Sequence, residues 1–136
     1  MRPNIVKQKF GRKETALGGW CAIGNPYSAE VMGHGGYDTV VVDLQHGMIY
    51  LDQAFAMLTA LSSTPAMPMV RVSENHFFEI NKLLDAGAYG VICPMIDDVA
   101  AAQRFVSACR YSPVGKRSYG PARGFLYGGA DYFAGP

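Results

Sequence analysis

Cysteine is scarce in this sequence, which has three cysteines among its 136 residues, Cys21, Cys93 and Cys109. An odd number without a CxxC spacing argues against a disulfide framework and against a cysteine-based metal cluster. Charge is also low, since 17% of the residues are charged and the formal net charge is +1. That balance offers no strongly basic surface for nucleic acid or for an anionic membrane, so neither is expected as a partner.

Long apolar runs are absent as well. No run approaches the roughly 20 residues that a membrane-spanning helix needs. The first residues include Lys7, Lys9, Arg12 and Lys13 without an apolar stretch, a pattern unlike that of a signal peptide. We therefore expect a cytoplasmic protein with reduced thiols.

The hydrophobic content of 49% is typical of a globular chain with a core. We expect residues 1–136 to form one domain, because this length is enough for one sizeable core. Four short apolar runs alternate with helical patterns. The runs cover residues 16–23, 39–43, 67–72 and 90–94, and the helical patterns begin at Asn25-Pro26 or cover residues 51–61, 77–86 and about 99–110.

This alternation predicts an α/β fold built from four βα units around a parallel sheet. The consecutive residues Val40, Val41 and Val42 favour a strand buried on both faces. An eight-stranded (β/α)₈ barrel and a doubly wound open sheet both fit such units. A doubly wound ligand-binding domain would need a glycine-rich turn after the first strand, whereas Gly18-Gly19 lie within it.

Four strands do not close a barrel, and after Pro113 the sequence becomes rich in glycine and aromatic residues with no obvious strand. Two explanations stay open. The chain is the first half of a barrel, or two copies associate to cover the open edges of the sheet.

Polar residues follow two neighbouring strands at the points where these strands end. Asp43, Gln45 and His46 follow the second run, and Arg71 ends the third. Because the carboxyl ends of parallel strands meet at one edge, we expect these side chains to lie together. The imidazole of His46 suits proton transfer at neutral pH, and the guanidinium of Arg71 suits a keto acid.

Each candidate also has a structural interpretation. His46 fits a hydrogen-bonded loop histidine, and Arg71 fits an ion pair with Asp43, which is compatible with keto-acid binding. Asp85, at the end of the third helical pattern, fits plain solvation or an interaction at the helix end as well as it fits catalysis.

Several short motifs occur in a distinctive order along the whole chain. They are Trp20 with Asn25-Pro26-Tyr27-Ser28-Ala29-Glu30, Gly36-Tyr37-Asp38, Asp43-Leu44-Gln45-His46-Gly47, Val70-Arg71-Val72, Leu83-Leu84-Asp85-Ala86-Gly87-Ala88, and Arg110-Tyr111-Ser112-Pro113 with Gly115-Lys116-Arg117. In order and spacing they resemble the HpcH/HpaI class of pyruvate aldolases, which includes 4-hydroxy-2-oxoheptanedioate aldolase and 2-keto-3-deoxy-rhamnonate aldolase.

The resemblance implies a TIM (β/α)₈ barrel of the phosphoenolpyruvate/pyruvate type, of which this chain covers the first four βα units. It implies a homo-oligomer, usually a hexamer. The implied reaction is the reversible retro-aldol cleavage of a 4-hydroxy-2-keto acid to pyruvate and an aldehyde. A divalent ion (Mg²⁺, Mn²⁺ or Co²⁺) stabilises the enolate in that reaction.

By position in the motifs, the resemblance makes His46 the acid/base histidine and Arg71 the arginine at the pyruvate oxygen. Asp85 matches an aspartate that works with the histidine, and Asp43 an acidic residue near the arginine. Gln45 stands where many members have glutamate.

The chain departs from the family pattern at its end. The family's metal ligands are a glutamate of the fifth strand and an aspartate of the sixth, so no ligand is assigned here and the expected ones lie beyond residue 136. Two functions follow as hypotheses. The chain belongs to a carbon–carbon lyase whose other half lies elsewhere, or it is a non-catalytic half-barrel that serves as an assembly or binding module.

Overall fold

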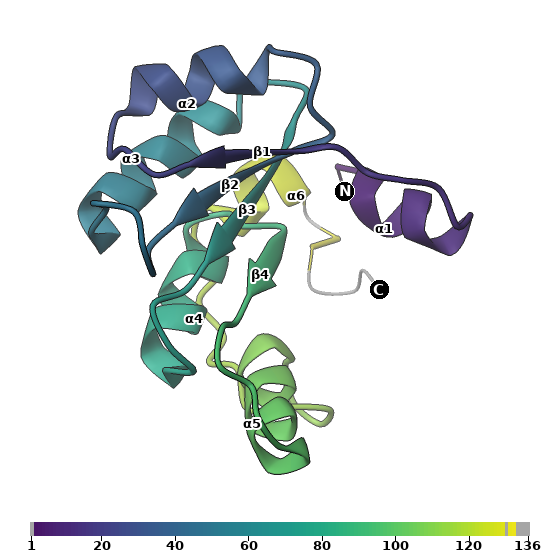
Figure 1. Ribbon diagram of the computed structural model, residues 1–136. Helices are drawn as coiled ribbons and strands as arrows, with labels where there is room; N and C mark the ends of the chain where they lie inside the picture. The colour runs from purple at the N-terminus through teal and green to yellow at the C-terminus, as the bar shows by residue number, and fades with distance from the viewer. Residues whose placement is uncertain (1, 130, 133–136) are drawn as a thin grey trace.

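Four parallel strands in the order β1-β2-β3-β4 form the centre of the computed structural model, which describes residues 2–129 and 131–132 (Figure 1). The strands are β1 (Gly18–Cys21), β2 (Thr39–Asp43), β3 (Met67–Arg71) and β4 (Gly90–Ile92). The helices are α1 (Ile5–Gly11), α2 (Pro26–Gly33), α3 (Leu51–Leu61), α4 (Phe77–Asp85), α5 (Val99–Cys109) and α6 (Gly124–Gly128). The sequential strand order and parallel pairing confirm the predicted series of four βα units.

Local sequence signals explain where the helices begin and end. The Asn25 side chain accepts a hydrogen bond from the Ser28 amide at 3.0 Å, with Pro26 in the first turn of α2. Asp98 caps α5 in the same way through the Ala101 amide at 2.6 Å. Gly87 follows α4 with a φ of +108°, a conformation that favours glycine. The short helices α1 and α6 were not predicted.

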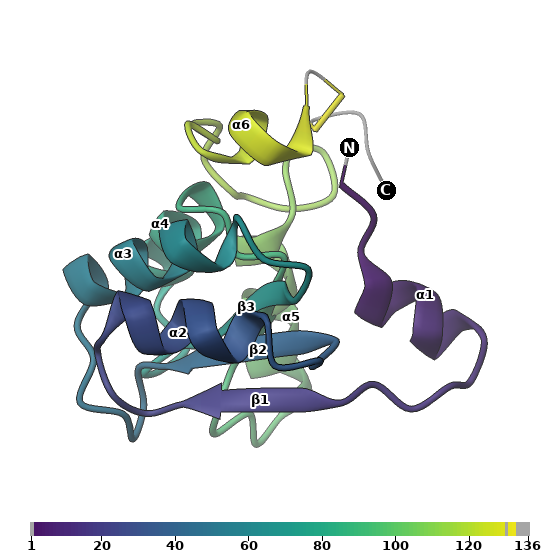
Figure 2. The ribbon, with the colours of Figure 1, turned by 90° about the horizontal axis from the view of Figure 1, so that it is seen from above.

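The two faces of the sheet have different roles. Cys21, Val42 and Val70 belong to the core formed with α2, α3 and α4, which lie together on one side of the sheet (Figure 2). Residues in register point to the same side, and successive residues alternate. The other face therefore holds Trp20 beside Val41 and, at the carboxyl ends, Asp43 beside Arg71. All five residues of β2 are buried, as the valine run predicted.

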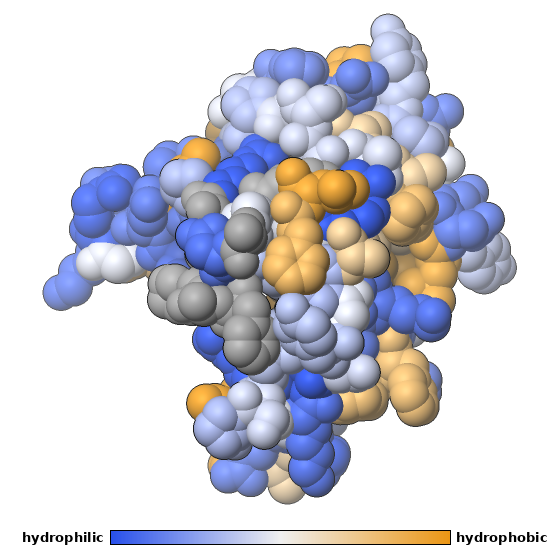
Figure 3. All heavy atoms as spheres, turned by 180° about the vertical axis from the view of Figure 1, so that it is seen from behind, coloured by the Kyte–Doolittle hydropathy of each residue, from blue (hydrophilic) through white to orange (hydrophobic). Residues whose placement is uncertain are grey.

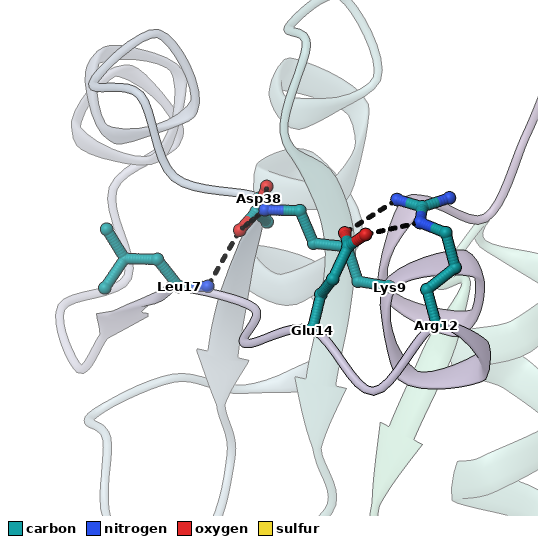
Figure 4. A network of polar contacts seen from close by, with 5 residues as sticks. All are labelled: Lys9, Arg12, Glu14, Leu17 and Asp38. Carbon is teal, nitrogen blue, oxygen red and sulfur yellow. Dashed lines mark hydrogen bonds and ion pairs between the residues drawn. The ribbon is translucent and has the colours of Figure 1, made fainter.

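Helix α1 is attached near the amino end of β2 (Figure 4). Asp38 accepts a hydrogen bond from the Leu17 amide at 2.8 Å and pairs with the Lys9 ammonium at 2.7 Å. The Arg2 guanidinium donates to the carbonyls of Thr64 and Ala66, directly before β3, at 2.7 and 2.9 Å. The segment before the first predicted strand is therefore tied to the amino side of the sheet.

Helix α6 lies behind α3 and α4, on the side of these helices that faces away from β1 (Figure 2), and places hydrophobic side chains on the surface (Figure 3). Leu126 is 73% exposed and Phe125 is 39% exposed. The longest helices have 11 residues, and no helix in the described part of the chain is long and apolar enough to cross a membrane.

Candidate active site

Asp43 and Arg71 stand opposite each other at the carboxyl ends of β2 and β3. The Asp43 Oδ1 atom accepts from Arg71 Nε at 2.8 Å, and its Oδ2 atom accepts from Arg71 Nη2 at 2.6 Å. This is a two-point ion pair in which the planar guanidinium matches the carboxylate. The ion pair offered as a structural interpretation of Arg71 is therefore present.

Asp43 accepts three further hydrogen bonds. The Trp20 indole Nε1 donates to Oδ2 at 3.0 Å, and the amides of Gln45 and His46 donate to Oδ1 at 3.0 and 3.3 Å. The Asp43 side chain is only 2% exposed, so these donors replace water around a buried charge. Its carboxylate is thus a fixed structural centre with little capacity to accept a substrate proton.

The electrostatics of the pair follow from these contacts. The hydrogen bond from Arg71, aided by Trp20 and the two amides, holds the pKa of Asp43 well below its usual range despite burial, which acts the other way. The same contact raises the pKa of Arg71, against a smaller opposing effect of desolvation. Both groups are therefore charged at neutral pH.

The guanidinium of Arg71 keeps donors for a ligand. Arginine has five N–H donors, and two hydrogen bonds go to Asp43, which leaves three donors. In the described part of the chain, no acceptor lies within hydrogen-bonding distance of Arg71 Nη1. The Arg71 side chain is 21% exposed, so this edge of the guanidinium is open for a carboxylate or keto oxygen.

The backbone amides of Gln45 and His46 tie both residues to the edge at which Arg71 lies. His46 is exposed and Gln45 is half-buried. The structure thus brings together His46, Arg71, Asp43 and Gln45, four of the five residues singled out from the sequence.

Asp85 lies elsewhere. Asp85 is the last residue of α4, which runs from the carboxyl end of β3 back to the amino end of β4. It therefore lies toward the amino ends of the strands, whereas His46 lies at their carboxyl ends. The Oδ1 atom of Asp85 accepts from Arg117 Nη2 at 2.7 Å. Asp85 also lines a surface pocket of 380 Å³ together with Phe55 and Arg123. Within one chain, Asp85 does not approach the other candidates.

The residues that the structure describes do not fit a metal centre. No group of three or more histidine, cysteine, aspartate or glutamate side chains suitable for a metal ion occurs in the part of the chain that the structure describes. Asp43, the acidic residue paired with Arg71, already accepts hydrogen bonds from five donors. These residues alone therefore supply no metal ion to the reaction.

A sequence model of the HpcH/HpaI aldolase/citrate lyase family matches residues 17–127. The chain belongs to this family. It is 43% identical over 131 residues to a hydroxypyruvate/pyruvate aldolase of Rhizorhabdus wittichii, with 96% of this chain and 52% of that protein covered. A 5-keto-4-deoxy-D-glucarate aldolase of Escherichia coli is 35% identical over 134 residues, with coverages of 97% and 52%.

The crystal structure of an HpcH/HpaI aldolase/citrate lyase family protein from Burkholderia cenocepacia superposes with a TM-score of 0.83 at 28% identity. The match covers 97% of this chain and 55% of that one. The chain thus spans about half the length of the family members it matches. Its four βα units correspond to one half of a TIM-barrel fold, as the resemblance implied.

Sequence reasoning missed two residues that shape these sites. Trp20 entered the sequence analysis only as part of a motif, yet its indole N–H donates to Asp43. Arg117 likewise entered only as part of a motif, yet it is 8% exposed and paired with Asp85. A usable signal for Trp20 was its place in the strand predicted next to the one that ends in Asp43, because a partly buried indole N–H usually has an acceptor.

Proposed function

We propose that this chain supplies the keto-acid-binding and proton-transfer residues of a carbon–carbon lyase. The enzyme cleaves a 4-hydroxy-2-keto acid reversibly to pyruvate and an aldehyde. The observation that carries the proposal is the Asp43–Arg71 pair, which leaves three guanidinium donors at the edge where His46 lies. The aldolase names of the relatives from Rhizorhabdus wittichii and Escherichia coli support this reaction class.

In this proposal each residue has a defined role. Arg71 binds the carboxylate or keto oxygen of the substrate, and Asp43 holds Arg71 in place. His46 accepts the proton of the 4-hydroxyl group, directly or through a water molecule. The C3–C4 bond then breaks, its electrons form the enolate of pyruvate, and the aldehyde carbonyl forms. Protonation of the enolate at C3 gives pyruvate. Gln45 supports the loop through its amide bond to Asp43.

We propose that the remaining parts of the site come from a second half-barrel. We propose that a divalent ion, Mg²⁺, Mn²⁺ or Co²⁺, is held by acidic residues of a second half-barrel and stabilises the enolate. We also propose a homo-oligomer, which is a hexamer by family resemblance. Asp85 would act with His46 only if the Asp85 of one subunit lay beside the His46 of another. In the absence of such a subunit, Asp85 stays a partner of Arg117. We also propose a cytoplasmic location, in line with the three free thiols.

The test compares the 136-residue chain alone with the same chain continued through the second half of the Rhizorhabdus wittichii aldolase. A pyruvate-release assay is run on both with and without a chelator. We expect metal-dependent cleavage from the continued chain and essentially none from the 136 residues alone, because the expected metal ligands are absent from them. Absence of cleavage in both, with folding intact, would favour the alternative of a non-catalytic half-barrel that acts as an assembly or binding module.

Two variants of the continued chain test the roles. Arg71→Lys replaces the planar fork by a point charge and is expected to cost about 1.5–3 kcal/mol of transition-state stabilisation. His46→Gln removes the proton acceptor and is expected to lower kcat about 10²- to 10⁴-fold. Arg104→Lys and His34→Gln are matched controls, because both residues are exposed and lie outside the site. Unchanged kinetics in either site variant would exclude that role.

A further inference from the structure

Trp20 makes two separate contacts with the Asp43–Arg71 pair. Its indole Nε1 donates to Asp43 Oδ2 at 3.0 Å, and its ring lies 4.9 Å from the Arg71 guanidinium carbon, centroid to Cζ. Trp20 is 45% exposed, so the rest of the chain covers it only in part. The indole nevertheless uses its donor on a buried carboxylate and its ring face on a cation.

The two contacts restrain the guanidinium in different directions. Asp43 binds the Nε–Nη2 edge and sets the direction of Arg71 within the guanidinium plane. The indole ring adds a second contact, since the guanidinium carbon lies over the ring. The indole N–H and Arg71 Nη2 also meet at the same oxygen, Asp43 Oδ2. The two hydrogen bonds to Asp43 leave the Nη1 hydrogens and one Nη2 hydrogen of Arg71 as open donors.

We propose that Trp20 is a positioning residue, which fixes the guanidinium of Arg71 with its Nη1 edge presented to the keto acid. The proposal rests on the keto-acid site described above. An arginine side chain has many rotamers, and holding one of them before the ligand arrives lowers the cost of binding. Trp20 is then required for the affinity of Arg71 for a ligand, although it need not touch the reacting atoms.

The positioning is measurable without any ligand, through the exchange of the Arg71 Nε proton with water in ¹H–¹⁵N NMR spectra. The Arg71→Lys variant identifies the signal by its loss. Trp20→Phe keeps a ring and removes the indole N–H, and Trp20→Leu removes both contacts. We expect exchange to accelerate about 3- to 10-fold in Trp20→Phe and more in Trp20→Leu, relative to the amides of β2.

The use of amides in β2 as a reference separates this local effect from a general loss of stability. Tyr27→Leu is the matched control, since Tyr27 is 74% exposed on α2 and lies outside the pair's contacts. Trp20 is also the only tryptophan. Its single indole N–H signal should therefore move when Asp43 is replaced by Asn. An Arg71 Nε proton that exchanges equally in the wild type, Trp20→Phe and Trp20→Leu would overturn the inference.

Pyruvate is the probe for the second arm, with calorimetry or NMR as the readout. We expect the dissociation constant to rise about 3- to 10-fold in Trp20→Phe and further in Trp20→Leu. Variants of Trp20 that bind pyruvate as the wild type does, while Arg71→Lys does not, would overturn the positioning role. If the wild-type chain, continued through the second half-barrel, fails to bind pyruvate, the proposed function fails, and the exchange of the Arg71 Nε proton still decides the inference.

Discussion

Two arginine–aspartate pairs lie at opposite ends of the sheet, and they differ in which partner is buried. In the Asp43–Arg71 pair the carboxylate is 2% exposed and the guanidinium 21% exposed. In the Asp85–Arg117 pair the guanidinium is 5% exposed and the carboxylate 27% exposed. The first pair presents hydrogen-bond donors at the surface, whereas the second presents an acceptor.

Aromatic residues accompany both pairs but act differently. Trp20 contacts Arg71 from one side and leaves its outer edge open. Around Arg117, the Tyr111 ring lies 4.5 Å from the guanidinium carbon, and the Tyr132 hydroxyl accepts at 3.3 Å. The guanidinium of Arg117 is thus enclosed and joins the segment after α5 to α4. An arginine–aspartate pair thus exposes donors or an acceptor according to which of its two charges reaches the solvent.

Replacement of Asp43 by alanine should produce the largest loss of stability. The change leaves Arg71, the Trp20 indole and two amides without their shared acceptor. The loss of one partner of a buried pair costs about 3–5 kcal/mol. Urea unfolding measures it, with Asp97→Ala at an exposed position as the control. A loss below about 1 kcal/mol would mean that water replaces the carboxylate readily.

Acid should weaken the same pair. The pKa of Asp43 is lower in the folded protein than in the unfolded chain, because Arg71 stabilises the carboxylate. Its contribution is therefore complete above the unfolded value of about 3.9 and is lost as pH falls toward the depressed folded value. We expect about 2 kcal/mol of this contribution to disappear between pH 5 and pH 2.

Unfolding experiments across this range measure the acid effect, and Asp43→Asn removes the titrating group. The variant should be less stable at neutral pH and should show a shallower decline toward low pH. An equal decline in the variant and the wild type would assign the acid sensitivity to other carboxylates.

Replacement of Arg117 by methionine should cost less than the loss of Asp43. Asp85 is partly exposed and can be hydrated when its partner is absent, and methionine refills the apolar space beside Tyr111. We expect a loss of about 1–2 kcal/mol. Lys116→Met, at an exposed neighbour, is the control in urea unfolding. A loss larger than that of Asp43→Ala would reverse the order inferred from the two burial patterns.

The sequence was sufficient to predict the four βα units and the meeting of Asp43 and Arg71. Alternating apolar and helical patterns are local, and right-handed crossovers then bring neighbouring strand ends together. The environment of Arg117 was not predictable in this way. Its contacts with Asp85 and Tyr132 span 32 and 15 residues, and a basic dipeptide in a glycine-rich segment resembles solvated surface. The short helices α1 and α6 likewise depend on attachments to distant residues.

Alkaline pH should produce the smallest effect, and it acts on the second pair through Tyr111. Burial raises the pKa of Tyr111 to about 12, and the positive charge of Arg117 partly opposes that rise. A raised folded pKa means that the contribution to stability is complete below the unfolded value of about 10 and is lost as pH rises toward 12. We expect a loss of about 1 kcal/mol at pH 11.

Ultraviolet absorbance of the phenolate follows the ionisation of Tyr111, and Tyr111→Phe should remove this late step of the titration. Because the nearby cation opposes the shift, Arg117→Met should move that step to still higher pH; movement to lower pH would show that burial of the Tyr111 ring depends on Arg117.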